Sequence, residues 1–142
     1  MTTYTQVTDP YGWELILDCQ GGNENTRSKE AIEEFARTLV KAIDMEPYGD
    51  PIVEHFGKEA IKGYTLVQLI QTSSITVHFC DDSGDFYLNC HSCKPFDEME
   101  VIRHVSKHFH PVATNRRFIV RGAHRIREVP STVSEMLDRY GC

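Results

Sequence analysis

Residue types that can do covalent chemistry gather between Tyr64 and Lys94, around the hydroxyl cluster Thr72-Ser73-Ser74. Stretches of β-type residues flank this cluster, so the hydroxyls stand at a break between two strands. A cysteine, Cys93, follows at the end of the next such stretch. A serine at a strand break with a thiol beside it is suited to self-cleavage of the backbone and to later chemistry on the group left behind. Because a serine in a loop is more often a plain turn residue, this interpretation requires that the fold bring Cys93 to Ser73.

Side-chain alternation predicts how the two stretches pair. In residues 74–80 and 85–93, apolar side chains recur at every second position, as in strands that cover a core with one face. Asp81-Asp82-Ser83-Gly84, between them, is a turn signal. Since directly opposed residues share a face, the register sets Phe79 opposite Phe86, Val77 opposite Leu88, Ile75 opposite Cys90, Thr76 opposite Asn89 and Thr72 opposite Cys93. The sequence therefore predicts that Cys93 lies next to Ser73.

The remaining elements must hold this hairpin. In chain order we expect a strand over 13–19, a helix over 28–44, a loop over 46–63, a strand over 66–70, the hairpin, a helix over 95–109 opened by Pro95, a strand over 117–120 and a short helix over 130–140. The inward stripe of the second helix would be Phe96, Met99, Ile102, Val105 and Phe109. This order predicts an α+β fold, a single α/β-sandwich domain with an antiparallel sheet and its helices on one face. The other face, polar with Thr76, His78, Asn89, His91 and Cys93, is expected to line a cleft or a subunit interface.

Composition restricts the classes of function. The 142 residues are expected to form one domain over 1–142, and the formal net charge of −6 argues against binding nucleic acid. No apolar run has the length of a membrane span, and the N-terminus does not resemble a signal peptide. The five cysteines are odd in number and mostly lie on expected strands, so we expect reduced thiols and a cytoplasmic protein that does not bind membranes.

Two other clusters are less indicative of a site. Cys90 and Cys93 have a CxxC spacing, but on a strand they point to opposite faces, so we expect no metal there. His104 and His108 lie one helical turn apart without an acidic or thiol partner, and a solvated helix face is the expected setting. Cys19 is expected to be a buried thiol rather than a nucleophile.

Taken together, the spaced motifs resemble the bacterial and archaeal S-adenosylmethionine decarboxylases, pyruvoyl enzymes of spermidine synthesis. That family has Gly-x-Ser, a hydrophobic strand, Glu-Ser-His-x-Ser-x-His and, after a hairpin, Thr-Cys-Gly. The matching segments here, without a gap between them, are Gly63-Tyr64-Thr65, 66–70, Thr72 to His78 and Ser92-Cys93-Lys94. The similarity extends from about residue 13 to 120 and implies the same sandwich fold.

The resemblance also implies roles. Ser73 would attack the preceding carbonyl, the chain would be cut between Thr72 and Ser73, and elimination would leave a pyruvoyl cofactor on the larger fragment. That group would form a Schiff base with the substrate amine, and Cys93 would be the proton donor after carbon dioxide leaves. Thr65 and His78 would be the processing residues, with the Thr65 hydroxyl helping the ester to form and the His78 imidazole taking the α-proton during elimination. Ser73 and His78 are five residues apart on one strand, so their Cα atoms lie roughly 16 Å apart and His78 cannot easily reach Ser73 within one chain. The resemblance implies a homodimer with shared active sites, in which Thr65 and His78 act on the partner's serine.

Departures from the family pattern leave the substrate open. Thr72 replaces a Glu at the cut, and Lys94 replaces a Gly. Asp81 or Asp82 would replace the ribose-binding Glu, and Phe56 would serve as the adenine-stacking aromatic, because Glu59 falls at that position. S-adenosylmethionine is the leading small-molecule substrate. The alternatives are a pyruvoyl-dependent ornithine or arginine decarboxylase, and an unprocessed, non-catalytic paralogue that acts as a binding or regulatory subunit.

Overall fold

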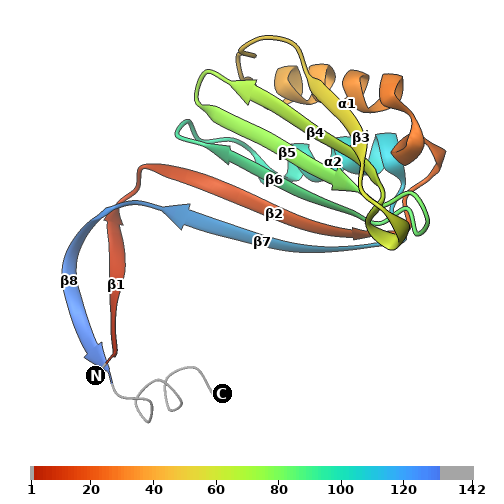
Figure 1. Cartoon of the computed structure of the whole chain (residues 1–142). Coiled ribbons are helices and arrows are strands. Elements are labelled where there is room, and N and C mark those ends of the chain that lie inside the picture. The colour runs from red at the N-terminus through yellow and green to blue at the C-terminus, as the bar shows by residue number, and fades with distance from the viewer. Residues whose placement is uncertain (1, 132–142) are drawn as a thin grey trace.

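The computed structural model describes the backbone of residues 2–131 and the side chains of residues 10–123. Its main element is a six-stranded antiparallel sheet with the strand order β3-β4-β5-β6-β2-β7 (Figure 1). These strands are β2 (Gly12–Gln20), β3 (Ile52–Phe56), β4 (Gly63–Ile70), β5 (Ser73–Phe79), β6 (Phe86–Ser92) and β7 (Ala113–Arg121). The helices are α1 (Lys29–Ala42) and α2 (Glu98–Phe109), with short 3-10 turns at Glu24–Arg27 and Glu59–Ile61. Two further strands, β1 (Thr2–Asp9) and β8 (His124–Ser131), pair with each other.

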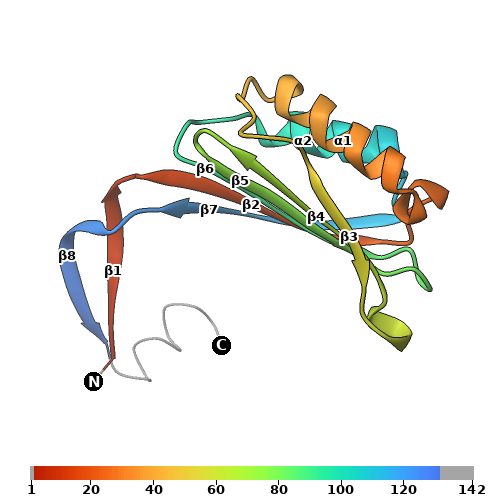
Figure 2. The same ribbon diagram turned by 45° about the horizontal axis from the view of Figure 1, so that its top comes forward.

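Both helices cover the same face of the sheet, as Figure 2 shows, and the hydrophobic core lies between them and the strands. In β5, Ile75, Val77 and Phe79 are buried, whereas the residues between them are partly exposed. The helices add a matching stripe of buried side chains, which includes Ile32, Phe35 and Leu39 from α1 and Val101, Val105 and Phe109 from α2. Each fully buried side chain of this size contributes about 1.5–3 kcal/mol, so the alternation decides which face is covered. The predicted α+β architecture is confirmed.

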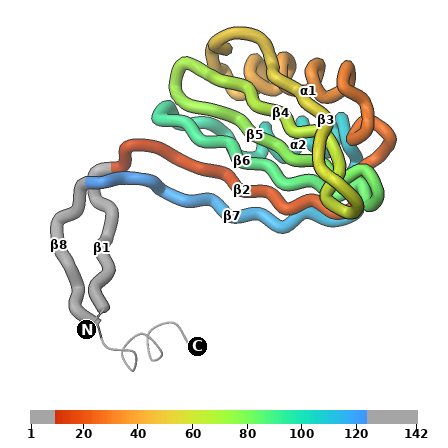
Figure 3. The backbone as a smooth tube through the Cα atoms, viewed as in Figure 1, coloured from red at the N-terminus to blue at the C-terminus, as the bar shows by residue number. Residues whose placement is uncertain are grey.

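The predicted hairpin register is also confirmed. Phe79 pairs with Phe86, Val77 with Leu88, Ile75 with Cys90 and Thr76 with Asn89. Past the end of the ladder, the Cys93 N–H donates to the Thr72 carbonyl oxygen at 3.0 Å. Figure 3 shows β5, β6 and β2 running side by side, so the hairpin occupies the middle of the sheet rather than its edge. A central position leaves no alternative partner for the hairpin strands.

Several predicted boundaries differ from the structure. The stretch 46–63 contains a strand, β3, in addition to a 3-10 turn. Only Val53 of this strand is buried, because β3 lies at the edge of the sheet, and alternation is therefore absent from its sequence. The strand expected over 117–120 is part of the longer β7, which pairs with the whole of β2.

Two predicted helix starts, at Pro95 and at Pro130, also differ from the structure. Pro95 does not open α2, because the Asp97 side chain caps it by accepting the Met99 N–H at 2.9 Å. Met99 is 41% exposed and lies outside the core. The expected helix over 130–140 does not begin at Pro130, which pairs with Thr3 in the β1–β8 ladder. The remainder of that helix lies outside the described residues.

The two helices meet through a histidine pair that the sequence assigned to solvent. His104 is half-buried, its Nε2 lies 2.6 Å from Thr38 Oγ1 of α1, and its ring lies 4.4 Å from that of His108. Burial, followed by the charges of His108 and Lys107, lowers the pKa of His104 from 6.5 to about 4. The folded protein therefore holds this imidazole neutral at the junction between α1 and α2.

This site predicts a loss of stability in mild acid. Because the folded pKa of His104 lies below the unfolded value, the unfolded chain binds the proton more readily between pH 6.5 and pH 4. The free energy of unfolding should fall across that window by about 1 kcal/mol, after allowance for partial solvent screening. Urea titrations at pH 7 and pH 5 should show a smaller fall for His104→Gln. His110→Asn, which removes an exposed imidazole from the end of the same helix, is the control. An unchanged pH dependence in His104→Gln would contradict the assignment.

No helix among residues 2–131 is long and apolar enough to cross a membrane.

Candidate functional site

The Thr72–Ser73 peptide link lies at the tight turn between β4 and β5. Ile70 pairs with Ser73, so residues 71 and 72 alone make the connection. The loop after α1 supports the turn, because the Gln71 N–H donates to the Glu46 carbonyl at 2.9 Å. The Thr72 carbonyl is the group that Ser73 would attack, and it already accepts the Cys93 N–H. A donor on a carbonyl oxygen stabilises the negative charge that develops there during attack.

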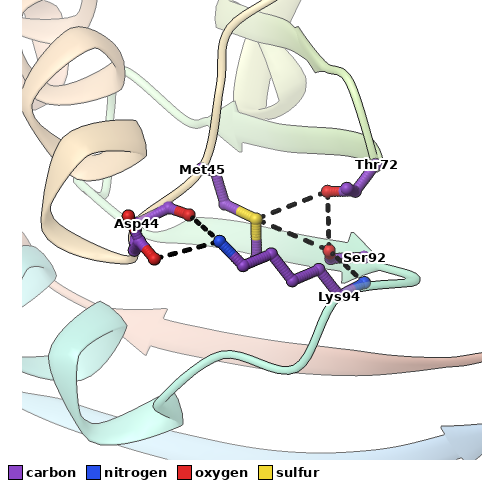
Figure 4. A network of polar contacts seen from close by, with 5 residues as sticks. All are labelled: Asp44, Met45, Thr72, Ser92 and Lys94. Atoms are coloured by element: carbon purple, nitrogen blue, oxygen red, sulfur yellow. Dashed lines mark hydrogen bonds and ion pairs between the residues drawn. The ribbon is translucent and has the colours of Figure 1, made fainter.

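The Thr72 side chain is held on the helix-covered side of the turn by the network in Figure 4. Ser92, which is fully buried, donates from its Oγ to Thr72 Oγ1 at 2.7 Å, and Thr72 Oγ1 in turn donates to Met45 Sδ at 3.3 Å. The Lys94 N–H donates to Ser92 Oγ at 3.0 Å. These contacts anchor the residue before the candidate cut, so the carbonyl of Thr72 is kept towards Cys93.

The Lys94 side chain extends this network to Asp44, at the end of α1. Its Nζ donates to the Asp44 backbone carbonyl at 2.6 Å and to the Asp44 carboxylate at 3.0 Å. The ion pair is exposed to solvent and contributes at most about 1 kcal/mol. It nevertheless ties the segment that carries Cys93 to the end of α1, across the residues that hold Thr72 (Figure 4).

The Ser73 hydroxyl contacts His91, for which the sequence pattern predicts only a position on the polar face of the sheet. Its Oγ lies 3.3 Å from His91 Nδ1 on β6. Alternation did contain a usable signal, because the confirmed register pairs His91 with Ser74, one residue from the candidate nucleophile. The His91–Ser73 contact is the main addition that the structure makes to the predicted site.

Cys93 differs from the other cysteines in its exposure. It is exposed, whereas Cys19 and Cys90 are buried, and Cys80 is half-buried. Burial raises the pKa of Cys19 to about 11 and that of Cys90 to about 12, so these two thiols are poor nucleophiles and poor acids. Cys90 is buried whereas Cys93 is exposed, and no group of three or more potential metal ligands occurs among the residues that the structure describes. Cys93 is therefore the available thiol beside the candidate cut.

Thr65 and His78 form a second polar pair at the opposite end of β5. They are directly opposed on β4 and β5, with 2.7 Å between Thr65 Oγ1 and His78 Nδ1. Gly63 permits the close approach of the strands here, since a Cβ at this position would lie 1.8 Å from the Phe79 carbonyl oxygen. The structure thus joins the two predicted processing residues to each other. Within one chain it does not bring them to Ser73, which lies five positions from His78 on the same strand, roughly 16 Å away.

A comparison with known families adds a decisive finding to this geometry. Residues 13–122 match the family described as S-adenosylmethionine decarboxylase. The chain belongs to the S-adenosylmethionine decarboxylase family. The solved structure of the adenosylmethionine decarboxylase from Aquifex aeolicus VF5 is similar, with a TM-score of 0.70 and 18% sequence identity, over 84% of this chain and 98% of that one. At this identity the likeness supports the fold alone. A comparison with curated protein sequences found no significant match.

The three candidate substrate-binding residues of this decarboxylase family member have different surroundings. Phe56 is 55% exposed, and its ring centroid lies 6.3 Å from that of His78. Asp81 is engaged by His55, whose Nε2 lies 2.7 Å from Asp81 Oδ2, whereas Asp81 Oδ1 is buried without a partner. Asp82 is exposed in the loop between β5 and β6. Phe56 is therefore next to a predicted site residue, and Asp82 is the freer of the two carboxylates.

Proposed function

We propose that this chain is a self-processing, pyruvoyl-dependent decarboxylase that acts on S-adenosylmethionine in polyamine synthesis. Its membership of the S-adenosylmethionine decarboxylase family is the observation that carries this proposal. The local geometry supports it, because the serine, the carbonyl it would attack and an exposed thiol meet at one turn. In this assignment Ser73 is the nucleophile, Thr72 ends the smaller fragment, and Cys93 acts after processing.

The proposed self-cleavage begins with attack by Ser73 Oγ on the carbonyl carbon of Thr72. The bond from that carbon to the Ser73 nitrogen then breaks, and an ester replaces the peptide link. Removal of the Ser73 α-proton expels the Thr72 carboxylate, and hydrolysis by water with loss of ammonia leaves a ketone at the new N-terminus. The bond from the Cys93 N–H to the Thr72 carbonyl supports the first step, because it lies on the oxygen that becomes negative.

The surroundings of Ser73 are compatible with a pyruvoyl group. Ser73 is half-buried at the start of β5, and its backbone after the cut remains within a paired strand. When present, such a group supplies a carbonyl that binds a substrate amine and accepts the electron pair released as carbon dioxide leaves. Cys93 would hold the proton that the substrate carbon needs afterwards. Its exposed thiol, unlike those of Cys19 and Cys90, can be reached by a ligand bound on the open side.

We further propose a homodimer in which Thr65 and His78 serve the partner's Ser73. The sheet face that the helices leave uncovered carries apolar side chains, each between 38% and 55% exposed, namely Ile52, Phe56, Leu69, Tyr87 and Ile119. Exposed apolar side chains gathered on one face favour burial against another protein surface. A two-fold contact through this face would allow the far end of one β5 to meet the near end of the other.

Mixing two inactive variants tests this arrangement. Neither His78→Ala nor Ser73→Ala alone should yield a pyruvoyl-blocked 73–142 fragment. In a mixed dimer, the His78→Ala chain supplies Ser73 and the Ser73→Ala chain supplies His78. Intact-mass analysis after the two variants are refolded together should therefore detect that fragment. Complete processing of His78→Ala on its own would contradict action in trans, as would an uncut mixture that is demonstrably dimeric.

A decarboxylase of ornithine or arginine is the second candidate. The engagement of Asp81 by His55 favours it, because that carboxylate is not free to bind ribose hydroxyls. Glu59, at the position expected to stack on adenine, is exposed in a 3-10 turn. Release of carbon dioxide from S-adenosylmethionine, ornithine and arginine by the cleaved protein distinguishes the candidates. Turnover of an amino acid without turnover of S-adenosylmethionine would overturn the proposed substrate. A chain that stays at 16.3 kDa during prolonged incubation would favour a non-catalytic subunit instead.

A further inference from the structure

We propose that His91 is the general base that activates Ser73 for the first step of self-cleavage, within the same chain. This inference rests on the proposed function, since it assigns a residue to the processing reaction. Among the residues that the structure describes, His91 is the histidine whose ring reaches the Ser73 hydroxyl, with 3.3 Å between His91 Nδ1 and Ser73 Oγ. A general base must lie within or close to hydrogen-bonding distance of the proton that it removes, and such contacts are often long before the reaction.

The fold fixes the His91 ring in this position. His91 pairs with Ser74 on one side and with Glu14 on the other, so its backbone lies within the central ladder. Gly12 leaves room for the ring, because a Cβ there would lie 3.2 Å from His91 Nε2. The ring of Tyr11 packs edge-on at 6.4 Å between centroids. The imidazole is therefore held by its neighbours with Nδ1 towards Ser73.

The other ring nitrogen has no hydrogen-bond partner within the described part of the chain. His91 Nε2 is buried and makes no hydrogen bond. A cavity of about 380 Å³ adjoins the residue and is lined by Tyr11, His91, Arg121, Gly122 and Ala123. The two charged side chains nearby, Glu14 and Arg121, form an ion pair with each other and so largely neutralise each other's charge. Among the side chains of residues 10–123, none therefore competes for His91 Nε2, and the cavity is large enough for water or a small base.

The proton balance of the step is simple. As Ser73 Oγ bonds to the Thr72 carbonyl carbon, its proton moves to His91 Nδ1, and the carbonyl oxygen becomes negative beside the Cys93 N–H. When the bond from that carbon to the Ser73 nitrogen breaks, His91 returns the proton to the leaving amine. The step is a rearrangement without net gain or loss of a proton. His91 would thus take the serine proton in cis during ester formation, and His78 would remain to take the α-proton during the elimination.

This division of work predicts different products in two variants. Hydroxylamine cleaves an ester but leaves a peptide bond intact. His78→Ala should therefore form the ester and yield fragments when hydroxylamine is added, whereas His91→Ala should remain largely as an uncleaved peptide. Fragments in equal amount from both variants would contradict the assignment of His91 to ester formation.

The rate and its pH dependence provide the main test. Intact-mass time courses should show cleavage of His91→Ala slowed about 100-fold, with addition of imidazole restoring part of the rate through the cavity. His91→Gln, which keeps a polar side chain of similar reach and thus protects folding, should lose the decline in rate at acidic pH that the wild type shows. Asn89→Ala, on the same face of β6, is the matched control and should cleave normally. Wild-type rates and pH profiles in both His91 variants would overturn this inference and leave the proposed function intact. A wild type that never cleaves would refute both.

Discussion

Ser73→Ala should abolish self-cleavage, so that the purified protein remains a single 16.3 kDa chain while the wild type separates into residues 1–72 and 73–142. The expected effect is complete, because alanine has no oxygen to attack the Thr72 carbonyl, and the Thr72 hydroxyl on the other side of the link is bonded to Ser92 and Met45. The side-chain contact of Ser73 is with His91, and the network around Thr72 does not use the Ser73 hydroxyl. The variant should therefore keep its fold. Intact-mass analysis over hours to days measures the result.

Ser74→Ala is the matched control for this prediction. Ser74 is adjacent and half-buried, but it faces the open side of the sheet opposite Leu69 and His91. Its loss should leave cleavage intact. Cleavage of Ser73→Ala at the wild-type position, or its abolition in Ser74→Ala alone, would show that the nucleophile has been misassigned.

Cys93→Ala should separate processing from turnover. The substitution removes the thiol but retains the backbone N–H that donates to the Thr72 carbonyl, so self-cleavage should continue. Decarboxylation needs a proton donor beside the new N-terminus, and loss of a positioned donor costs about 100-fold or more in rate. Carbon dioxide release should therefore fall by at least about that factor while the two fragments still appear.

Cys80→Ala provides the comparison. Cys80 is a half-buried thiol at the other end of the hairpin, and burial raises its pKa. This variant should cleave and turn over as the wild type does. Full decarboxylase activity in Cys93→Ala would exclude Cys93 as the proton donor, and a complete failure to cleave would mean that the thiol itself acts during processing.

Local pattern was sufficient to predict the hairpin and the core. The alternation over 74–80 and 85–93 admits one register that buries Phe79, Val77 and Ile75 together, and the structure has that register. Where alternation is absent, prediction failed. β3 buries one residue because it is an edge strand, and the start of α2 depends on the Asp97 cap rather than on the preceding proline. The edge position of β3 depends on neighbours that are distant in sequence, whereas the Asp97 cap is a local contact with the Met99 N–H that the sequence already contained.

The sequence by itself determined the architecture, the likeness to the decarboxylase family and the pairing of Thr72 with Cys93, because each follows from residue type at short, regular spacing. Tertiary structure alone decided three features of the site. These are the contact of Ser73 with His91, the anchoring of Thr72 by Ser92 and Met45, and the engagement of Asp81 by His55. The physical reason is that side-chain direction at a turn, and the packing of α1 against β4, depend on the folded chain as a whole. Hydrogen bonds of about 3 Å require positions that no spacing rule specifies.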